Sequence, residues 1–238
     1  MQPSNCGVFV FRHALVETPC YDSAGLNLGV GLKSFLESVH GQYGSILIDP
    51  PWRFSNSTGK VAPEHKRLRR YSTMSFDEIA ALPVNQVALP QSHLYMWTPN
   101  ALLFEALTIM KAWGFTYKTN IVWYKVRKDG GPDGRGVGFY FRNVTELLLF
   151  GTRGKLRTLK PGRTQVNVMI SRKEEHSKKP DSCYDLIERC SPGPHLELFS
   201  RQRIPGWTQW GDEVDSYGVQ RRLIPAYNGW ARAASASG

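Results

Sequence analysis

The sequence has little cysteine and no cysteine arrangement typical of a metal site. Its 238 residues include four cysteines, with no Cys-x-x-Cys pair and no neighbouring histidine array: Cys6, Cys20, Cys183 and Cys190. Structural zinc sites use closely spaced pairs of such ligands. We therefore expect no metal, and reduced thiols of the kind usual in cytoplasmic proteins.

Long apolar segments are also absent. No apolar run approaches the roughly 20 residues that a membrane-spanning helix needs. The first residues, MQPSNCGVFVFRHALVE, lack the basic start and long apolar stretch of a secretory signal peptide. We expect a cytoplasmic protein without a membrane partner.

Signatures of several common enzyme classes are missing. The chain has no internal repeat and no Gly-x-x-x-x-Gly-Lys-Ser/Thr sequence, so a phosphate-cradling loop of that type is not indicated. No Ser-His-Asp or Cys-His arrangement points to nucleophilic catalysis. The glycine-rich stretch 127–138 is interpreted as a flexible basic loop.

What the sequence does have is a localised positive charge. The formal net charge is +10. The segment 118–179 holds 15 Lys and Arg against 5 acidic residues, and the rest of the chain holds 15 against 15. So concentrated a basic surface favours a polyanionic partner, most simply nucleic acid. A solvated, solubilising face is the alternative.

Strands and helices alternate along the chain. This alternation predicts an α/β fold with a largely parallel sheet covered on both faces. Expected strands are 43–49, 93–98, 115–126, 145–152, 166–170 and 195–200, and expected helices are 75–82, 100–113 and 180–193. We expect a single domain over 1–216 with inserted basic loops at 53–72 and 127–163, followed by a partly disordered tail over 217–238.

Two helices carry specific local signals. Ser75 and Glu78 are spaced as a capping box at the start of the first helix. In the second, the expected apolar stripe is Leu103, Leu107, Met110 and Trp113.

Two expected strands end in unusual residues. One is followed by Asp49-Pro50-Pro51-Trp52, and the other runs Glu197-Leu198-Phe199-Ser200-Arg201. In open α/β sheets, ligands bind at the carboxyl ends of strands. We expect both ends to border one pocket.

The tetrapeptide Asp49–Trp52 suits methyl transfer to an exocyclic amine of a base. Two acceptors, the Asp49 carboxylate and the Pro50 carbonyl, can localise the amine lone pair. Prolines keep such a carbonyl rigid. Trp52 offers a face on which a flipped-out base can stack. The alternative is a strand stop followed by a core tryptophan.

With these residues in place, the chain resembles the Asp-Pro-Pro-Trp adenine-N6 methyltransferases, typified by the catalytic subunit of the messenger-RNA adenosine methyltransferase. It is closest to stand-alone prokaryotic or phage members. Collinear motifs carry the resemblance over about 43–214: DPPW, YSTMSFDEI, LYMWTPN, IVWYK, TELLLFGTRG, KKPDSCYDLIERCSPG, LELFSR and GWTQWGDEV. It implies a Rossmann-like S-adenosylmethionine-dependent fold in permuted order, with the catalytic strand before the cofactor strand.

The resemblance also implies roles for individual residues. The catalytic group is Asp49, Pro50, Pro51 and Trp52. The implied cofactor-binding residues are Asp49, Lys179, Phe199, Ser200, Arg201, Asp212 and Glu213, with S-adenosylmethionine as cofactor. Ser200 departs from the Gly or Ala of many members. Residues that contact the cofactor adenine are expected within 28–35.

Nucleic acid is the expected partner, through residues that neutralise phosphates or border the site. These are Lys60, Lys66, Arg67, Arg69, Arg70, Tyr71, Lys125, Arg142 and Glu146. For Glu146 a structural ion pair is an equal alternative. DNA is preferred over RNA because the chain is compact and resembles the stand-alone members. A catalytically inactive nucleic-acid-binding paralogue and a small-molecule methyltransferase are the other readings; monomer or homodimer stays undecided.

Overall fold

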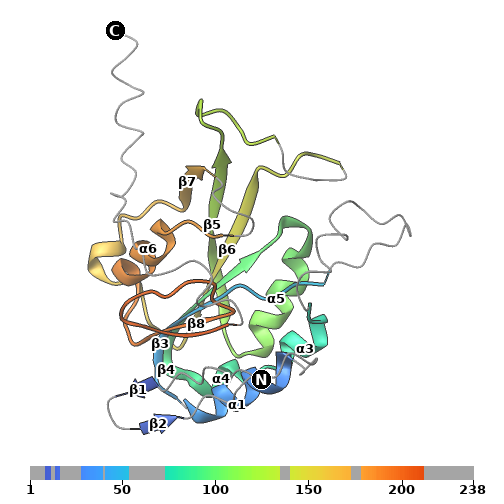
Figure 1. The fold of residues 1–238 in the computed structure, drawn as a ribbon. Helices are drawn as coiled ribbons and strands as arrows, with labels where there is room; N and C mark the ends of the chain where they lie inside the picture. Colours follow the sequence, from blue (N-terminus) through green and yellow to red (C-terminus); the bar gives the residue numbers. More distant parts are fainter. Residues whose placement is uncertain are drawn as a thin grey trace, which may run out of the picture.

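The structure is a computed structural model that describes residues 9–11, 14–16, 28–39, 41–53, 73–134, 140–172 and 178–211 (Figure 1). Its centre is a seven-stranded sheet of order β7-β5-β6-β4-β3-β8-β9. The strands are β3 (Tyr43–Ile48), β4 (Ala88–Thr98), β5 (Thr116–Val126), β6 (Thr145–Arg153), β7 (Val168–Arg172), β8 (His195–Leu198) and β9 (Trp207–Trp210). A separate antiparallel pair consists of β1 (Phe9–Phe11) and β2 (Ala14–Val16).

The prediction of a largely parallel sheet is confirmed. Strand β6 is antiparallel to both of its neighbours, β4 and β5. The other neighbouring pairs, β3–β4, β3–β8, β5–β7 and β8–β9, are parallel. Six strands therefore point their carboxyl ends toward one edge of the sheet, where β6 begins.

Helices cover both faces of this sheet, as predicted. They are α1 (Leu28–Ser38), α3 (Phe76–Ala80), α4 (Val84–Val87), α5 (Leu103–Ala112) and α6 (Ser182–Cys190), with 3-10 turns η1 (Asn100–Leu102) and η2 (Lys160–Gly162). Residues of α1, α3, α4 and α5 share one buried cluster with Ile46 and Ile48 of β3. Residues of α6 share a second cluster with Leu47, which points the opposite way because side chains alternate along a strand.

The same alternation places the functional strand ends. Asp49 follows β3 in phase with Leu47, so it belongs to the α6 face of the sheet. Along β6, Leu148 and Phe150 lie in the α6-face cluster, and Glu146 and Thr152 continue their phase. The α6 face therefore carries both the aspartate and a polar residue at each end of β6.

Local signals were predicted with mixed success. The Ser75–Glu78 capping box is present, with both reciprocal hydrogen bonds. The predicted stripe of α5 is confirmed in part: Met110 and Trp113 are buried and Leu107 packs against the core, whereas Leu103 is 37% exposed. The buried face also includes Ala106 and Ile109. No helix among the described residues is long and apolar enough to cross a membrane.

Candidate active site

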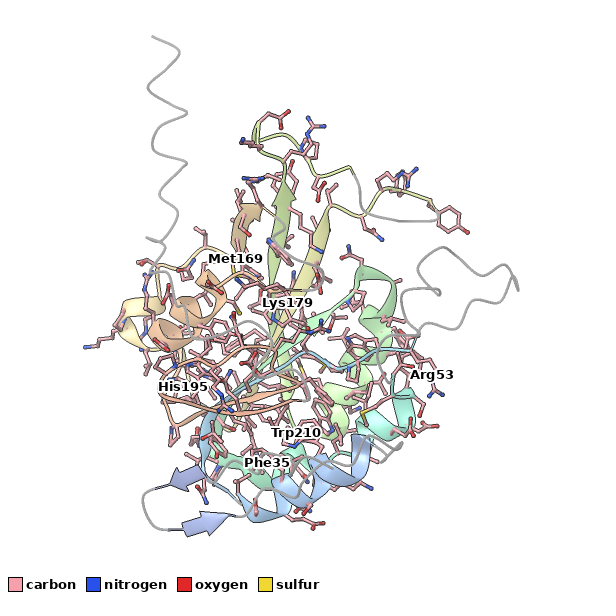
Figure 2. The ribbon with its side chains drawn as sticks, in the orientation of Figure 1. Phe35, Arg53, Met169, Lys179, His195 and Trp210 are labelled. Atoms are coloured by element: carbon pink, nitrogen blue, oxygen red, sulfur yellow. The ribbon has the colours of Figure 1, made fainter. Side chains whose placement is uncertain are left out.

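The two unusual strand ends lie side by side, as expected. Strands β3 and β8 are paired in parallel, and the Asp49 N–H donates to the Leu198 carbonyl at 3.4 Å. A small hollow at this edge is lined by Asp49, Lys178, Lys179, Tyr184, Glu197, Phe199, Arg201 and Gln202. Lys179 lies near the middle of the molecule, where these segments meet (Figure 2). The prediction that both ends border one pocket is confirmed.

Hydrogen bonds from three directions fix the tetrapeptide that follows β3. The Trp52 N–H donates to the Pro50 carbonyl at 2.8 Å, which closes a tight turn. The Met74 N–H donates to the Pro51 carbonyl at 2.9 Å. The Trp52 indole Nε1 donates to the Trp97 carbonyl of β4 at 3.1 Å. The turn is therefore rigid, as the two prolines predict.

The position of the Trp52 ring corrects one expectation. Trp52 is 6% exposed and packs in the core beside Met74 and Phe76. A ring with so little exposed area has no open face for a base to stack on. In this arrangement the indole anchors the turn, because its bulk fills the core and its N–H reaches β4.

A chain of alternating charges extends from Asp49 across the sheet. The Lys179 Nζ lies 3.3 Å from Asp49 Oδ2 and is hydrogen-bonded to Glu146 Oε1. The second oxygen of Glu146 accepts from Lys125 Nζ at 2.8 Å. All four side chains are at most 21% exposed. Lys179 also lies 5.2 Å from the centre of the Trp97 ring.

Burial and pairing act against each other in these groups. Burial raises the pKa of Asp49, and its attraction to Lys179 offsets this only in part. For Glu146, burial is outweighed by Lys179 and Lys125, which together lower its pKa to about 2. Burial disfavours the charge of Lys179, but Asp49 and Glu146 outweigh it and raise the lysine pKa. Lys179 is therefore a fixed cation, closer to Glu146 than to Asp49.

The predicted substrate residues fall into three groups. Lys125 and Glu146 are paired with each other and are 17% and 14% exposed, so the predicted role of Lys125 as a phosphate contact is not available, and Glu146 forms the structural ion pair that was its alternative. Arg142 is exposed. The remaining predicted contacts on the loop lie outside the described residues, as do two cofactor residues: Lys60, Lys66, Arg67, Arg69, Arg70, Tyr71, Asp212 and Glu213.

The turn after β8 contains a dense polar network that the sequence reasoning did not find. Glu197, which is 8% exposed, accepts from the Tyr184 hydroxyl at 2.8 Å and from Ser200 Oγ at 2.9 Å. The Gln209 amide nitrogen on β9 donates to the same carboxylate. The Gln209 side chain extends from the neighbouring strand β9 and completes the network. Neither β9 nor its pairing with β8 was predicted from the pattern WTQW.

This network also explains the departure at Ser200. Its hydroxyl lies between Glu197 and the Gln202 carbonyl, at 2.9 and 2.8 Å. A Gly or Ala there would leave the carboxylate one donor short. Phe199 just before it has φ 63°, a left-handed conformation unusual for a non-glycine residue.

We expect Glu197 to make stability depend on pH. Burial raises its pKa to about 7 from 4.5, despite three hydrogen-bond donors. Because the pKa is raised in the folded state, the contribution of Glu197 to the free energy of unfolding is fully present below about pH 4.5 and is lost as the pH rises through 7. The loss should reach about 3 kcal/mol.

Urea unfolding of the wild type and Glu197→Gln between pH 4.5 and 8 measures this. The substitution keeps the shape and removes the titration, so its curve should lose the decline. Equal slopes for the two proteins would show that Glu197 does not titrate in this range.

The fold and the site together define a class. A mostly parallel sheet, with an acidic turn and a charged, aromatic-lined pocket at paired strand ends, is the Rossmann-like methyltransferase arrangement. The model of the MT-A70 family matches residues 43–213, which is most of the chain. The chain therefore belongs to the MT-A70 family, whose members are adenine-N6 methyltransferases and are generally S-adenosylmethionine-dependent.

Individual relatives include a prokaryotic and several eukaryotic proteins. The chain is 27% identical over 189 residues to the type II methyltransferase M.MunI of Mycoplasma sp., covering 73% of this chain and 78% of that protein. It is 26% identical over 182 residues to the human N(6)-adenosine-methyltransferase catalytic subunit METTL3, covering 75% of this chain and 29% of METTL3. A Medicago truncatula putative N(6)-adenosine-methyltransferase is 27% identical over 207 residues, covering 82% of this chain and 31% of that protein. The chain thus spans under a third of these eukaryotic relatives.

Proposed function

We propose that the protein transfers a methyl group from S-adenosylmethionine to the N6 amine of adenine in DNA. The observation that carries this proposal is Asp49, held on a rigid turn at the paired ends of β3 and β8, beside the fixed cation Lys179. The class of enzyme follows from family membership, and the choice of DNA is our inference.

Asp49 and Pro50 would act as hydrogen-bond acceptors for the adenine amine. The Asp49 carboxylate can accept one N–H. The Pro50 carbonyl already accepts from the Trp52 N–H, but a carbonyl oxygen has a second lone pair. Acceptors fixed before the reaction stabilise charge that develops on the amine without reorganisation. The amine proton can leave late, to water.

The residues around the hollow suit the cofactor chemically. The methionine end of S-adenosylmethionine carries a carboxylate, an ammonium and a sulfonium. The hollow has cations in Lys178, Lys179 and Arg201, anions in Asp49 and Glu197, and the Phe199 ring. When bound, the cofactor supplies the electrophilic methyl group.

The hollow is small in this structure. Its free volume is about 20 Å³, close to that of one water molecule. We propose that Asp212 and Glu213 contact the nucleoside part of the cofactor, together with Phe199 and Arg201 of the hollow and Ser200 beside Glu197.

We favour DNA because the chain resembles the stand-alone members of the family. The match to the Mycoplasma type II methyltransferase agrees with this, because it covers 78% of that protein. RNA is the second candidate, since METTL3 is named an N(6)-adenosine-methyltransferase. The base must leave its stack to reach Asp49, which is easiest in single-stranded or distorted DNA. Because Trp52 is buried, the stacking partner of the base must be another residue.

Radiolabelled cofactor decides between the polymers. The full chain is incubated with methyl-labelled S-adenosylmethionine and, separately, double-stranded DNA, single-stranded DNA and RNA, followed by digestion to nucleosides. We expect label in N6-methyladenine from DNA. Label in RNA alone would overturn the choice of DNA, and cofactor binding without label in any polymer would overturn the activity.

A further inference from the structure

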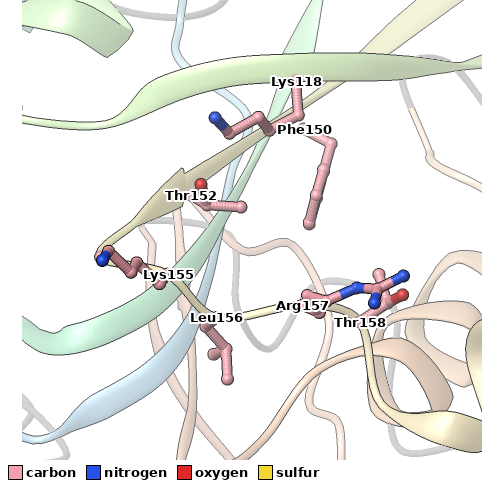
Figure 3. A pocket seen from close by; sticks show the side chains of 8 residues that line it. Lys118, Phe150, Thr152, Lys155, Leu156, Arg157 and Thr158 are labelled. Atoms are coloured by element: carbon pink, nitrogen blue, oxygen red, sulfur yellow. The ribbon is translucent and has the colours of Figure 1, made fainter.

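A second hollow lies at the opposite end of β6 from the charge chain. Figure 3 shows it between β5, the end of β6 and the segment that follows β6. Its volume is about 410 Å³, within the size range of small-molecule sites. Phe150 and Thr152 of β6 form one wall, and 154–158 form another.

Three cations surround this hollow: Lys118, Lys155 and Arg157. All three are exposed, and among the described residues no carboxylate lies within ion-pair distance of them. No acidic residue lines the hollow. Its charge is therefore available to a ligand, unlike that of Lys125 and Lys179.

The cations are held on a fixed backbone. The Lys155 N–H donates to Gln91 Oε1 at 2.8 Å. Gly154 has φ 71°, and a Cβ there would meet the Pro90 carbonyl at 2.6 Å. The wall is thus built against the start of β4, and only glycine allows this approach.

Buried His93 holds the next residue of the same wall. Its Nε2 donates to the Leu156 carbonyl at 3.2 Å, since a carbonyl can only accept, and in the neutral ring Nδ1 then accepts from Ser191 Oγ at 2.7 Å. Burial lowers the His93 pKa, which keeps the ring in the neutral form that this pattern needs. The wall that carries Lys155 and Arg157 is therefore preorganised.

A β-bulge directs the third cation. In the β5–β6 register, Tyr117 is opposite Gly151 and Thr119 is opposite Phe150, so Lys118 between them is unpaired. An extra residue of this kind re-aims its side chain and bends the strand. Lys118 thereby lines the hollow together with Phe150 and Thr152.

The hollow and the catalytic charge chain occupy one face of the sheet. Glu146 and Thr152 lie on the same face of β6, six residues apart, which is about 20 Å along a strand. That distance corresponds to about six base steps of a duplex at 3.4 Å each. Leu148 and Phe150 between these two residues are buried in the cluster with α6, so a nucleic acid that contacts both places passes around α6 and needs more than about six base steps.

We propose that this hollow binds backbone phosphates of the substrate nucleic acid at nucleotides outside the target adenine. The proposal rests on the nucleic-acid substrate of the proposed function and adds a second contact to it. Unpaired Lys and Arg neutralise phosphates, and two threonine hydroxyls, on Thr152 and Thr158, can donate to phosphate oxygens. Such contacts set position and affinity rather than base choice.

The test compares two variants of equal net charge. Lys155→Gln/Arg157→Gln removes two charges from the hollow, and Lys33→Gln/Lys111→Gln removes two exposed charges from α1 and α5. Binding of a 20-nucleotide adenine-containing duplex is measured by fluorescence anisotropy between 50 and 200 mM salt. The slope of log affinity against log salt should fall by about 1.8 in the hollow variant, and by less in its control.

Methylation kinetics provide a second readout. The hollow variant should show a raised KM for the 20-nucleotide duplex with unchanged kcat, and adding Lys118→Gln should raise KM further. The dinucleotide ApA, which has one phosphodiester, should be methylated equally by all variants.

The outcomes separate this proposal from the proposed function. Methylation with equal salt slopes in the two double variants would overturn the hollow as a polymer site and leave the activity standing. Loss of tripolyphosphate binding in the hollow variant, with the duplex slope unchanged, would mean a site for free anions and also overturn it. No binding of any nucleic acid by the wild type would overturn the proposed function itself.

Discussion

Replacing Asp49 with alanine should lower the rate of methyl transfer by about 10²–10³-fold, the usual effect of removing one preorganised polar group from the reacting centre. The loss should appear in kcat, because in the proposed reaction the carboxylate contacts the amine in the transition state. Label transfer from S-adenosylmethionine to adenine-containing polymer under saturating conditions measures it.

The fold should survive this substitution. Burial raises the pKa of Asp49, which means that its charge is held at a cost, and Lys179 keeps Glu146 as its nearer partner. Thermal unfolding of Asp49→Ala should therefore stay close to that of the wild type. Asp49→Asn keeps an oxygen acceptor without the charge, so its rate of methyl transfer should lie between those of the wild type and Asp49→Ala. Transfer by Asp49→Ala at the wild-type rate would refute the assigned mechanism.

Replacing Glu146 with glutamine should reduce the free energy of unfolding by about 3 kcal/mol, the lower end of the effect of breaking a buried ion pair. Glu146 neutralises both Lys179 and Lys125, and none of the three is more than 17% exposed. Without the carboxylate, Lys125 loses its ion-pair partner, and Lys179 keeps only its longer contact with Asp49 at 3.3 Å. Urea unfolding at pH 7 measures the change. The double variant Glu146→Gln/Lys125→Met also removes the cation that has lost its partner, so it should recover part of the lost free energy of unfolding.

The pH dependence gives an independent check on Glu146. Its pKa is lowered to about 2 from 4.5, so its contribution is fully present above pH 4.5 and is lost as the pH falls toward 2. Acid unfolding of Glu146→Gln should lack this component. An acid transition identical to that of the wild type would show that the two lysines do not depend on this carboxylate.

Much of the fold could be predicted because it depends on local pattern. Alternation of apolar strands with helices gave the parallel sheet, and the Ser75–Glu78 spacing gave a helix start that the structure contains. The α5 stripe was right at Met110 and Trp113 and wrong at Leu103, which is the first residue of the helix and is 37% exposed. Strand β9 was missed because its four residues, WTQW, are too few to show a period.

The site was predictable only as far as residue type identifies chemistry. Asp49 and the turn 199–201 could be placed in one pocket, because both follow strands of predictable direction, whereas Lys179 was placed there only by the family resemblance. The pairing of Glu146 with two lysines could not be predicted, because it joins β6, β5 and the segment before α6. The burial of Trp52 depends on its hydrogen bond to Trp97, 45 residues away in the chain. Contacts of this range follow from the assembled sheet.

The two ends of the segment 54–72 are fastened to each other next to the catalytic turn. Trp52 and Met74 form a β-bridge, and the Arg53 guanidinium donates to the Thr73 carbonyl at 3.2 Å. When the two ends of a loop are held together in this way, the length of the loop has little effect on the residues beside it. Doubling the number of residues between the two ends costs only about 0.6 kcal/mol in loop-closure entropy. The position of Asp49 therefore does not depend on the number of residues between Arg53 and Thr73.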